Sequence, residues 1–244
     1  MIPLNTIQQG DCLEVMKDIP DKSVDLTLTD IPYEEVNRKD NGLRNLNKEN
    51  ADIKTFEIMD FIKEVDRITK GTIIIFCGNE QYSTIYRFFS DKQKKSLGTV
   101  RQIIWAKTNP SPMNGEFIYL SGTENAVWFK NKGSTFNAHC KKNYFQFPCG
   151  RSKMHPTEKN HKLLQELIID NSKVGDLIFD PCAGSGSHLL NAKLLNRNFI
   201  GVELEPKYVE VAQKRIMEVK SGCNANDNGI PPNNKLLGIL PTIL

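Results

Sequence analysis

The stretch GDLIFDPCAGSGSHLLNAKLLNRNFIGVELEPKY, residues 175–208, decides the fold. It predicts an apolar strand ending at Asp180, a glycine turn, a helix, and a second strand ending at Glu203. Gly184 and Gly186 have no Cβ, so the backbone of the turn is free to bend tightly and to approach a ligand closely. This order of elements is the building unit of a parallel sheet with helices on both faces.

The same stretch indicates which ligand the turn binds. Glu203 stands where the acid of such a unit accepts hydrogen bonds from a ribose. A phosphate loop would need Lys-Ser/Thr where this chain has Ser187-His188, and a dinucleotide turn would need a third glycine where it has Leu189. Asp180 at the strand end instead favours a cationic or amine-bearing ligand. S-adenosylmethionine, with its ribose, sulfonium and ammonium, meets these requirements.

The rest of the chain repeats the alternation of strands and helices. Helical patterns cover 55–69, 80–89 and the segments around Leu164 and Ala212. We therefore predict an α/β fold with a doubly wound sheet. The seven predicted strands are 6–9, 24–29, 72–77, 102–105, 126–129, 177–179 and 199–202.

Composition limits the class of protein. The chain has 244 residues, 39% of them hydrophobic and 25% charged, as in a folded globular protein. It contains no apolar run long enough to cross a membrane, and its first residues do not resemble a secretory signal. The six cysteines form no framework of regular spacing, so we expect reduced thiols and a cytoplasmic location.

Charge is unevenly distributed. Residues 100–162 carry ten Lys or Arg against three acids, although the whole chain has a net charge of only +3. A basic segment on an acidic remainder indicates a polyanionic partner, and a solvated surface is the alternative. Three segments interrupt the strand–helix alternation: a polar stretch at 34–52, a basic and aromatic stretch at 108–150, and a tail at 221–244 that ends in KLLGILPTIL.

A second strand that ends in an acid occurs early, in VDLTLTDIPY, residues 24–33. Asp30 ends the strand, and Ile31 is kept extended by Pro32, so its carbonyl can face the same space as the Asp30 carboxylate. Tyr33 adds an aromatic face. Two acceptors and a ring suit the amino group of a nucleobase: the ring stacks on the base, and the acceptors stabilise the positive charge that grows as the amine attacks.

The chain resembles the amino-methylating DNA methyltransferases in three motifs. These are DIPY, then HPTEK at 155–159, and then DPCAGSG. The catalytic tetrapeptide precedes the cofactor turn, which is the order of the beta class. The resemblance covers most of residues 6–220. It implies a seven-stranded, mainly parallel sheet with one reversed strand and a permuted motif order. We accordingly predict a catalytic domain at 1–220, a target-recognition insertion at 108–150 within it, and a C-terminal tail at 221–244.

The resemblance also implies a role for each matching position. Asp30, Ile31, Pro32 and Tyr33 would hold the target amine. Asp11, with Cys12 beside it, would bind the adenine of the cofactor. His155 and Thr157 would cover the methionine carboxylate, and Glu203 would hold the ribose. The turn around the methionine and sulfonium would be formed by Asp180, Cys182, Ala183, Gly184, Ser185 and Gly186.

Three positions depart from the family pattern. Ile31 replaces the first proline of the tetrapeptide, Asn160 stands where proline commonly follows HPTEK, and Ser187-His188 replaces a threonine pair. In the family, Asp at the head of the tetrapeptide goes mostly with adenine N6 and Ser with cytosine N4. We therefore predict direct methyl transfer to adenine N6 in double-stranded DNA, on a flipped-out base, with N4-cytosine as the alternative.

DNA contacts are expected outside the catalytic turn. The loop at 34–52 follows Tyr33 directly and would close over DNA, while the residues that read the sequence would lie in 108–150. The basic residues of that loop are Arg38, Lys39, Arg44 and Lys48. The candidates for phosphate contacts are Lys107, Lys130, Lys132, Lys141, Lys142, Arg151 and Lys153.

Other functions remain as alternatives. A nicotinamide oxidoreductase rests on the glycine unit alone, and a non-catalytic DNA-binding protein would keep the fold without transfer. RNA or a protein amide would offer a similar amine. Cytosine-C5 chemistry lacks the residues that support a nucleophilic cysteine, and a zinc site lacks a C-x-x-C pair, so no metal is predicted. The apolar tail leaves a homodimer open.

Overall fold

The computed structural model describes residues 2–33, 56–112, 115–149 and 159–219. Their strands form one eight-stranded sheet in the order β1-β8-β7-β2-β3-β5-β4-β6. The strands are β1 Thr6–Gln9, β2 Val24–Asp30, β3 Thr69–Cys77, β4 Gly98–Lys107, β5 Thr123–Asn131, β6 Tyr144–Phe147, β7 Leu177–Asp180 and β8 Asn198–Glu203.

Strand direction confirms the α/β prediction. The β1-β8-β7-β2-β3 series is parallel throughout, and β5 is the reversed strand, antiparallel to both β3 and β4. All seven predicted strands are present. The eighth, β6, pairs in parallel with β4 and was not predicted, because its four residues alternate in burial with no long apolar run. Both β5 and β6 fall inside the segment 108–150, so part of that segment belongs to the sheet.

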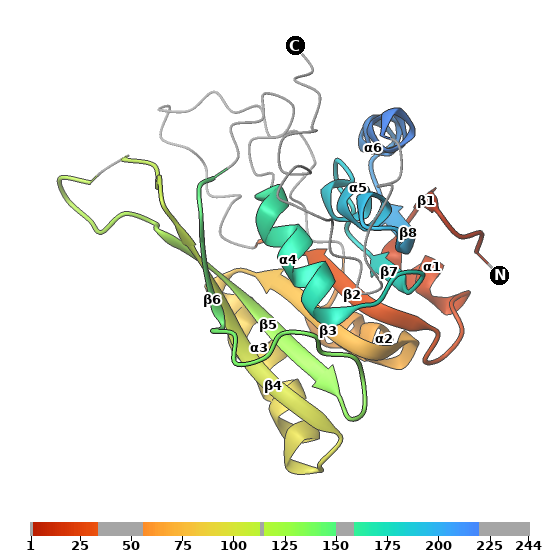
Figure 1. Cartoon of the computed structure of the whole chain (residues 1–244), viewed down its shortest axis with the longest axis horizontal. Coiled ribbons are helices and arrows are strands. Elements are labelled where there is room, and N and C mark those ends of the chain that lie inside the picture. Colours follow the sequence, from red (N-terminus) through yellow and green to blue (C-terminus); the bar gives the residue numbers. More distant parts are fainter. Residues whose placement is uncertain (1, 34–55, 113–114, 150–158, 220–244) are drawn as a thin grey trace.

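Helices cover both faces of the sheet (Figure 1). One buried cluster joins Met16, Phe61 and Phe89 of the first three helices to one face, and the other joins Leu167 and Leu189 of the later helices to the opposite face. The described helices are α1 Cys12–Lys17, α2 Ile58–Ile68, α3 Asn79–Lys94, α4 His161–Asn171, α5 Ser187–Leu194 and α6 Pro206–Glu218.

Local sequence explains most of these helices. In α2, Phe61, Ile62 and Val65 recur at helical spacing and are fully buried. Pro206 opens α6, where its fixed φ suits the first turn. The six-residue α1 was not predicted, because so short a segment carries little periodicity. Its N-cap is Asp11, whose carboxylate accepts from the Leu13 N–H.

The carboxyl ends of the parallel strands share one edge of the sheet, which we call the carboxyl edge. Strands β1, β8, β7 and β2 are consecutive neighbours, and Asp11, Glu203, Asp180 and Asp30 stand at or just after their ends. Adjacent strands lie about 4.8 Å apart. The fold therefore brings together four acids that are widely separated in the sequence.

Candidate active site

The acids of the β1-β8-β7 side are held by backbone N–H groups. Asp11 accepts from Leu13 N at 2.8 Å. Glu203 accepts from Gly184 N at 2.7 Å and from Glu205 N at 2.9 Å. Burial raises the pKa of Glu203, and the two backbone donors oppose that rise.

The glycine turn between β7 and α5 needs both of its glycines. Gly184 and Gly186 have φ angles of +51° and +79°, which side-chain-bearing residues rarely adopt. A Cβ on Gly186 would lie 2.8 Å from the Ala212 Cβ, whereas a Cβ on Gly184 would meet nothing within 4 Å. Gly186 thus lets the turn pack on α6, and Gly184 faces open space beside Glu203.

Asp180 lies beneath this turn and is fully buried. One of its oxygens accepts from Cys182 N at 3.1 Å, and the other lies 2.7 Å from Nδ1 of His188. His188 is itself buried, and its Nε2 has no partner among the residues that the structure describes. A hydrogen bond with Cys12, together with burial, raises the pKa of the Cys182 thiol well above its usual value. The start of α1 therefore meets the turn that follows β7.

These features fit S-adenosylmethionine. A ribose needs an acceptor such as Glu203, a nearby cation suits Asp180, and the open space at Gly184 permits close approach of a ligand to the backbone. Arg215 of α6 donates to the Ser185 carbonyl at 2.9 Å and holds the turn in place.

The second half of the site is the turn after β2. Ile31 continues the sheet, because its N–H donates to the Phe76 carbonyl at 3.2 Å, and its side chain is buried. A proline at position 31 has no N–H to make that bond. Gln81 of α3 donates to the Pro32 carbonyl at 2.8 Å and accepts from Gly78 N at 3.0 Å. The backbone that carries the Asp30 carboxylate and the Ile31 carbonyl is therefore fixed from two sides.

Lys159 enters this half of the site, although the sequence placed HPTEK over the cofactor. Its Nζ lies 2.6 Å from Asp30 Oδ2, 3.2 Å from the Tyr33 hydroxyl and 2.6 Å from Glu124 Oε2. Lys107, predicted as a phosphate contact, lies 2.8 Å from Glu124 Oε1. The sequence did not predict that Glu124 and Gln81 belong to the site, or that Lys159 contacts Asp30. The only sequence signal for any of the three was that Lys159 is the last residue of the HPTEK motif.

Electrostatics tie these groups together. Burial raises the pKa of Asp30, and Lys159 opposes that rise. Burial alone would lower the pKa of Lys159, but Asp30, Tyr33 and Glu124 raise it well above its ordinary value. Burial raises the pKa of Glu124, yet Lys159 and Lys107 outweigh it, so its pKa lies below the usual range. Lys159 and Glu124 are therefore charged near neutral pH, and the ammonium of Lys159 favours the charged form of Asp30.

The remaining predicted residues are distributed as follows. His155, Thr157, Arg38, Lys39, Arg44, Lys48, Arg151 and Lys153 lie outside the described residues. Lys130 stands near the far end of β5 and Lys132 just after it, away from the carboxyl edge. Across residues 2–33, 56–112, 115–149 and 159–219, no cluster of three or more His, Cys, Asp or Glu is placed to hold a metal. No helix in those same ranges is long and apolar enough to span a membrane.

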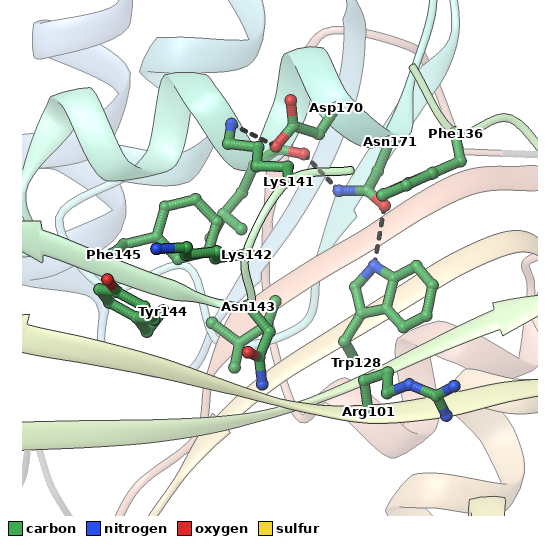
Figure 2. Close-up of a pocket in the computed structure, with 12 residues that line it drawn as sticks. Arg101, Trp128, Phe136, Lys141, Lys142, Asn143, Tyr144, Phe145, Asp170 and Asn171 are labelled. Carbon is green, nitrogen blue, oxygen red and sulfur yellow. Dashed lines mark hydrogen bonds and ion pairs between the residues drawn. The ribbon is translucent and has the colours of Figure 1, made fainter. Parts of the chain in front are cut away.

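Lys141 and Lys142 line a cavity of about 420 Å³ between β4–β6 and α4 (Figure 2). Lys141 is paired with Asp170 at 2.6 Å, and Trp128 donates to Asn171 at 2.8 Å. Arg101, which also lines the cavity, lies six residues before the end of β4, or about 20 Å from the carboxyl edge at 3.3 Å per residue. This cavity is therefore separate from the site described above.

Comparison with known proteins agrees with the geometry. An acid-ended glycine turn beside a second acid-ended turn, on one edge of an α/β sheet, is the arrangement expected of a methyltransferase that acts on amino groups. The chain belongs to the N6/N4 DNA methylase family, whose model matches residues 24–214. It is 34% identical to the type II methyltransferase M.HinfI of Haemophilus influenzae, over 91% of this chain and 70% of that protein. It is 26% identical to the type II methyltransferase M2.MboI of Moraxella bovis, over 87% and 88% of the two chains.

Solved structures show the same relationship. A crystal structure of an M1.HpyAVI–SAM complex superposes with a TM-score of 0.66 at 29% identity, covering 86% of this chain and 98% of that one. The cytosine-N4-specific PvuII DNA methyltransferase superposes with a TM-score of 0.67 over 92% and 89% of the two chains. Its 19% identity to this chain supports the shared fold only.

Proposed function

We propose that this chain transfers a methyl group from S-adenosylmethionine to the N6 amino group of adenine in double-stranded DNA. The observation that carries the proposal is Asp30, with one oxygen held by Lys159 and the other buried without a partner among the described residues. Asp30 lies on the strand next to the cofactor turn. A target amine bound there is within reach of both halves of the site.

S-adenosylmethionine supplies the methyl group as an electrophile on its sulfonium. Asp11, Glu203 and the turn from Asp180 to Gly186 would hold it. The M1.HpyAVI structure, described as a SAM complex, supports this assignment. Asp30 and the Ile31 carbonyl would accept the two N–H groups of the amine, and Tyr33 would stack on the base. The acceptors stabilise the positive charge that develops on the nitrogen, without a covalent bond to the enzyme.

Adenine is favoured because Asp stands at position 30, where Ser in this family goes mostly with cytosine N4. A base stacked in a duplex cannot present its amine to this edge, so it must turn out of the helix. The β4–β5 connection, which projects away from the sheet in Figure 1, starts and ends at the same edge. It exposes Phe117, Ile118, Tyr119 and Leu120, and we expect it to contact the duplex.

The test is to incubate the protein with S-adenosylmethionine and unmethylated DNA and to map modified bases by single-molecule sequencing. N6-methyladenine at one recurring sequence is the expected result. N4-methylcytosine would replace the base assignment, and DNA binding without modification would identify a non-catalytic DNA-binding protein. The type II names of the relatives support a role in restriction-modification. Sedimentation with and without DNA tests whether it acts as a homodimer.

A further inference from the structure

Lys159 reaches Asp30 from a distant part of the chain. The two residues are 129 positions apart, and the lysine side chain is only 4% exposed. Its Nζ also lies 5.4 Å from the centre of the Tyr33 ring and 5.1 Å from that of Phe76. Contacts with carboxylates and ring faces on several sides hold the cation in one place.

The lysine belongs to a row of four alternating charges. Asp30 contacts Lys159, Lys159 contacts Glu124, and Glu124 contacts Lys107, at 2.6, 2.6 and 2.8 Å. The four side chains carry no net charge together. Since a buried charge that loses its partner is strongly unfavourable, each member depends on its neighbour. Lys107 therefore acts on Asp30 through Glu124 and Lys159.

The two oxygens of Asp30 have different surroundings. Oδ2 is bound to Lys159, whereas Oδ1 is buried and has no partner in the described part of the chain. A buried carboxylate oxygen without a donor is unfavourable, so a site that maintains one is prepared for a donor that arrives from outside. The amino group of the target base is such a donor.

Resting on the proposed function, we propose that Lys159 is a positioning residue for methyl transfer. Its ammonium fixes Asp30 Oδ2 and keeps the carboxylate charged, while Glu124 and Lys107 hold the ammonium in place. Oδ1 is thereby left free, and correctly oriented, to accept the target amine. The lysine itself contacts neither the methyl group nor the attacking nitrogen.

This role has a consequence with a definite sign. Asp30 works only when ionised, so the rate of transfer falls as the pH drops through its pKa. Removing the positive charge of Lys159 raises that pKa, and removing the negative charge of Glu124 lowers it. The charged and titratable groups that face Asp30 are Lys159, Glu124, His188, Tyr33 and Cys77.

The experiment measures the Asp30 titration directly, by carboxyl ¹³C NMR of the protein without DNA or cofactor, with the resonance assigned from Asp30→Asn. In Lys159→Met the midpoint should rise by about 1 to 3 pH units, in Lys159→Arg by much less, and in Glu124→Gln it should fall. Lys92→Met is the matched control. Lys92 is 16% exposed, is paired with Asp66 and lies 5.0 Å from the centre of the Phe129 ring, at the far end of α3.

Single-turnover methylation completes the test. The acid limb of the rate should move with the Asp30 midpoint in each variant, and Lys92→Met should leave both unchanged. If Lys159→Met leaves the midpoint and the acid limb where they are, or if Glu124→Gln shifts the midpoint in the same direction, the proposal is wrong. Because the titration needs no substrate, an enzyme that failed to methylate DNA would overturn the proposed function without altering that result.

Discussion

The two halves of the carboxyl edge hold their acids by different means. On the cofactor side, Asp11 and Glu203 accept from backbone N–H groups, two of which lie only two residues further along the chain. On the transfer side, Asp30 is held by a lysine 129 residues away, and the Tyr33 hydroxyl lies 3.5 Å from Glu124, 91 residues away. One half is built from turns, and the other from charged side chains.

The difference has functional meaning. Backbone donors keep their place as long as the turn is folded, and they do not titrate. Side-chain ion pairs depend on single residues and on pH, but they can be balanced around a carboxylate that must stay charged in a buried place. Substitutions should therefore separate the two halves: those of the transfer side should change rate, and those of the cofactor side should change cofactor affinity or stability.

The largest effect is expected from Asp30→Ala. It removes the acceptor that stabilises the developing charge, so the single-turnover rate should fall at least about 1000-fold. Affinity for S-adenosylmethionine, measured by calorimetry, should stay within about twofold, because the cofactor acids lie on other strands. Asp60→Asn, at an exposed acid of α2, is the control. Loss of cofactor binding together with transfer would show that the two halves are not separable.

Gly186→Ala tests the backbone of the cofactor side. Its Cβ would meet the Ala212 Cβ at 2.8 Å in a left-handed conformation, so the free energy of unfolding should fall by about 2 to 4 kcal/mol. Gly184→Ala has the same backbone strain but open space, and should cost about 1 to 2 kcal/mol. Denaturant titration measures both. Equal losses in the two variants would contradict the packing on α6.

Glu203→Gln should weaken cofactor binding about tenfold, because a neutral amide replaces the charged acceptor for the ribose. Burial raises the pKa of Glu203, so wild-type affinity should decline, as the pH falls, at a higher pH than for an ordinary glutamate. The part of this pH dependence that comes from protonation of Glu203 should be absent in Glu203→Gln. Calorimetric titration at several pH values measures it, with exposed Glu210→Gln as the control. An unchanged affinity in Glu203→Gln would remove Glu203 from the site.

The smallest effect is expected from Tyr33→Phe. The ring remains, and only the hydroxyl contacts with Lys159 at 3.2 Å and with Glu124 at 3.5 Å are lost, so the rate should fall about threefold. Tyr33→Ala also removes the stacking surface and should cost about 10- to 100-fold. The ratio of the single-turnover rates of Tyr33→Phe and Tyr33→Ala at saturating DNA separates the contribution of the hydroxyl from that of the ring. If Phe is as damaging as Ala, the hydroxyl, and not the stacking face, carries the role of Tyr33.

Much of the fold was predictable from local pattern. The seven predicted strands are all present, since most of them are short apolar runs bounded by turns or helices. The glycine turn and both acid-ended strands were recognised for the same reason, because their chemistry lies within a few consecutive residues. The strand β6 was missed because its residues alternate in burial with no apolar run, and the helix α1 was missed because six residues carry too little helical periodicity.

Residues that act through distant partners were placed less well. Lys107 looked like a phosphate contact because it lies in a basic stretch, yet it is paired with Glu124 at 2.8 Å. Lys159 was grouped with a motif expected to cover the cofactor, yet it is bonded to Asp30. Charge and residue type give no information on which of many acids a lysine will meet after folding.

The sequence alone was enough to predict the strand–helix alternation, the glycine turn, the two acids that end strands, and the class of reaction. Those features depend on neighbours in sequence. The folded sheet settled how Asp30 is held, because Glu124 of β5 and Lys159, just before α4, come close to the end of β2 only after long loops close. Which charges then pair is determined by distance in space and by burial, and both are properties of the packed structure.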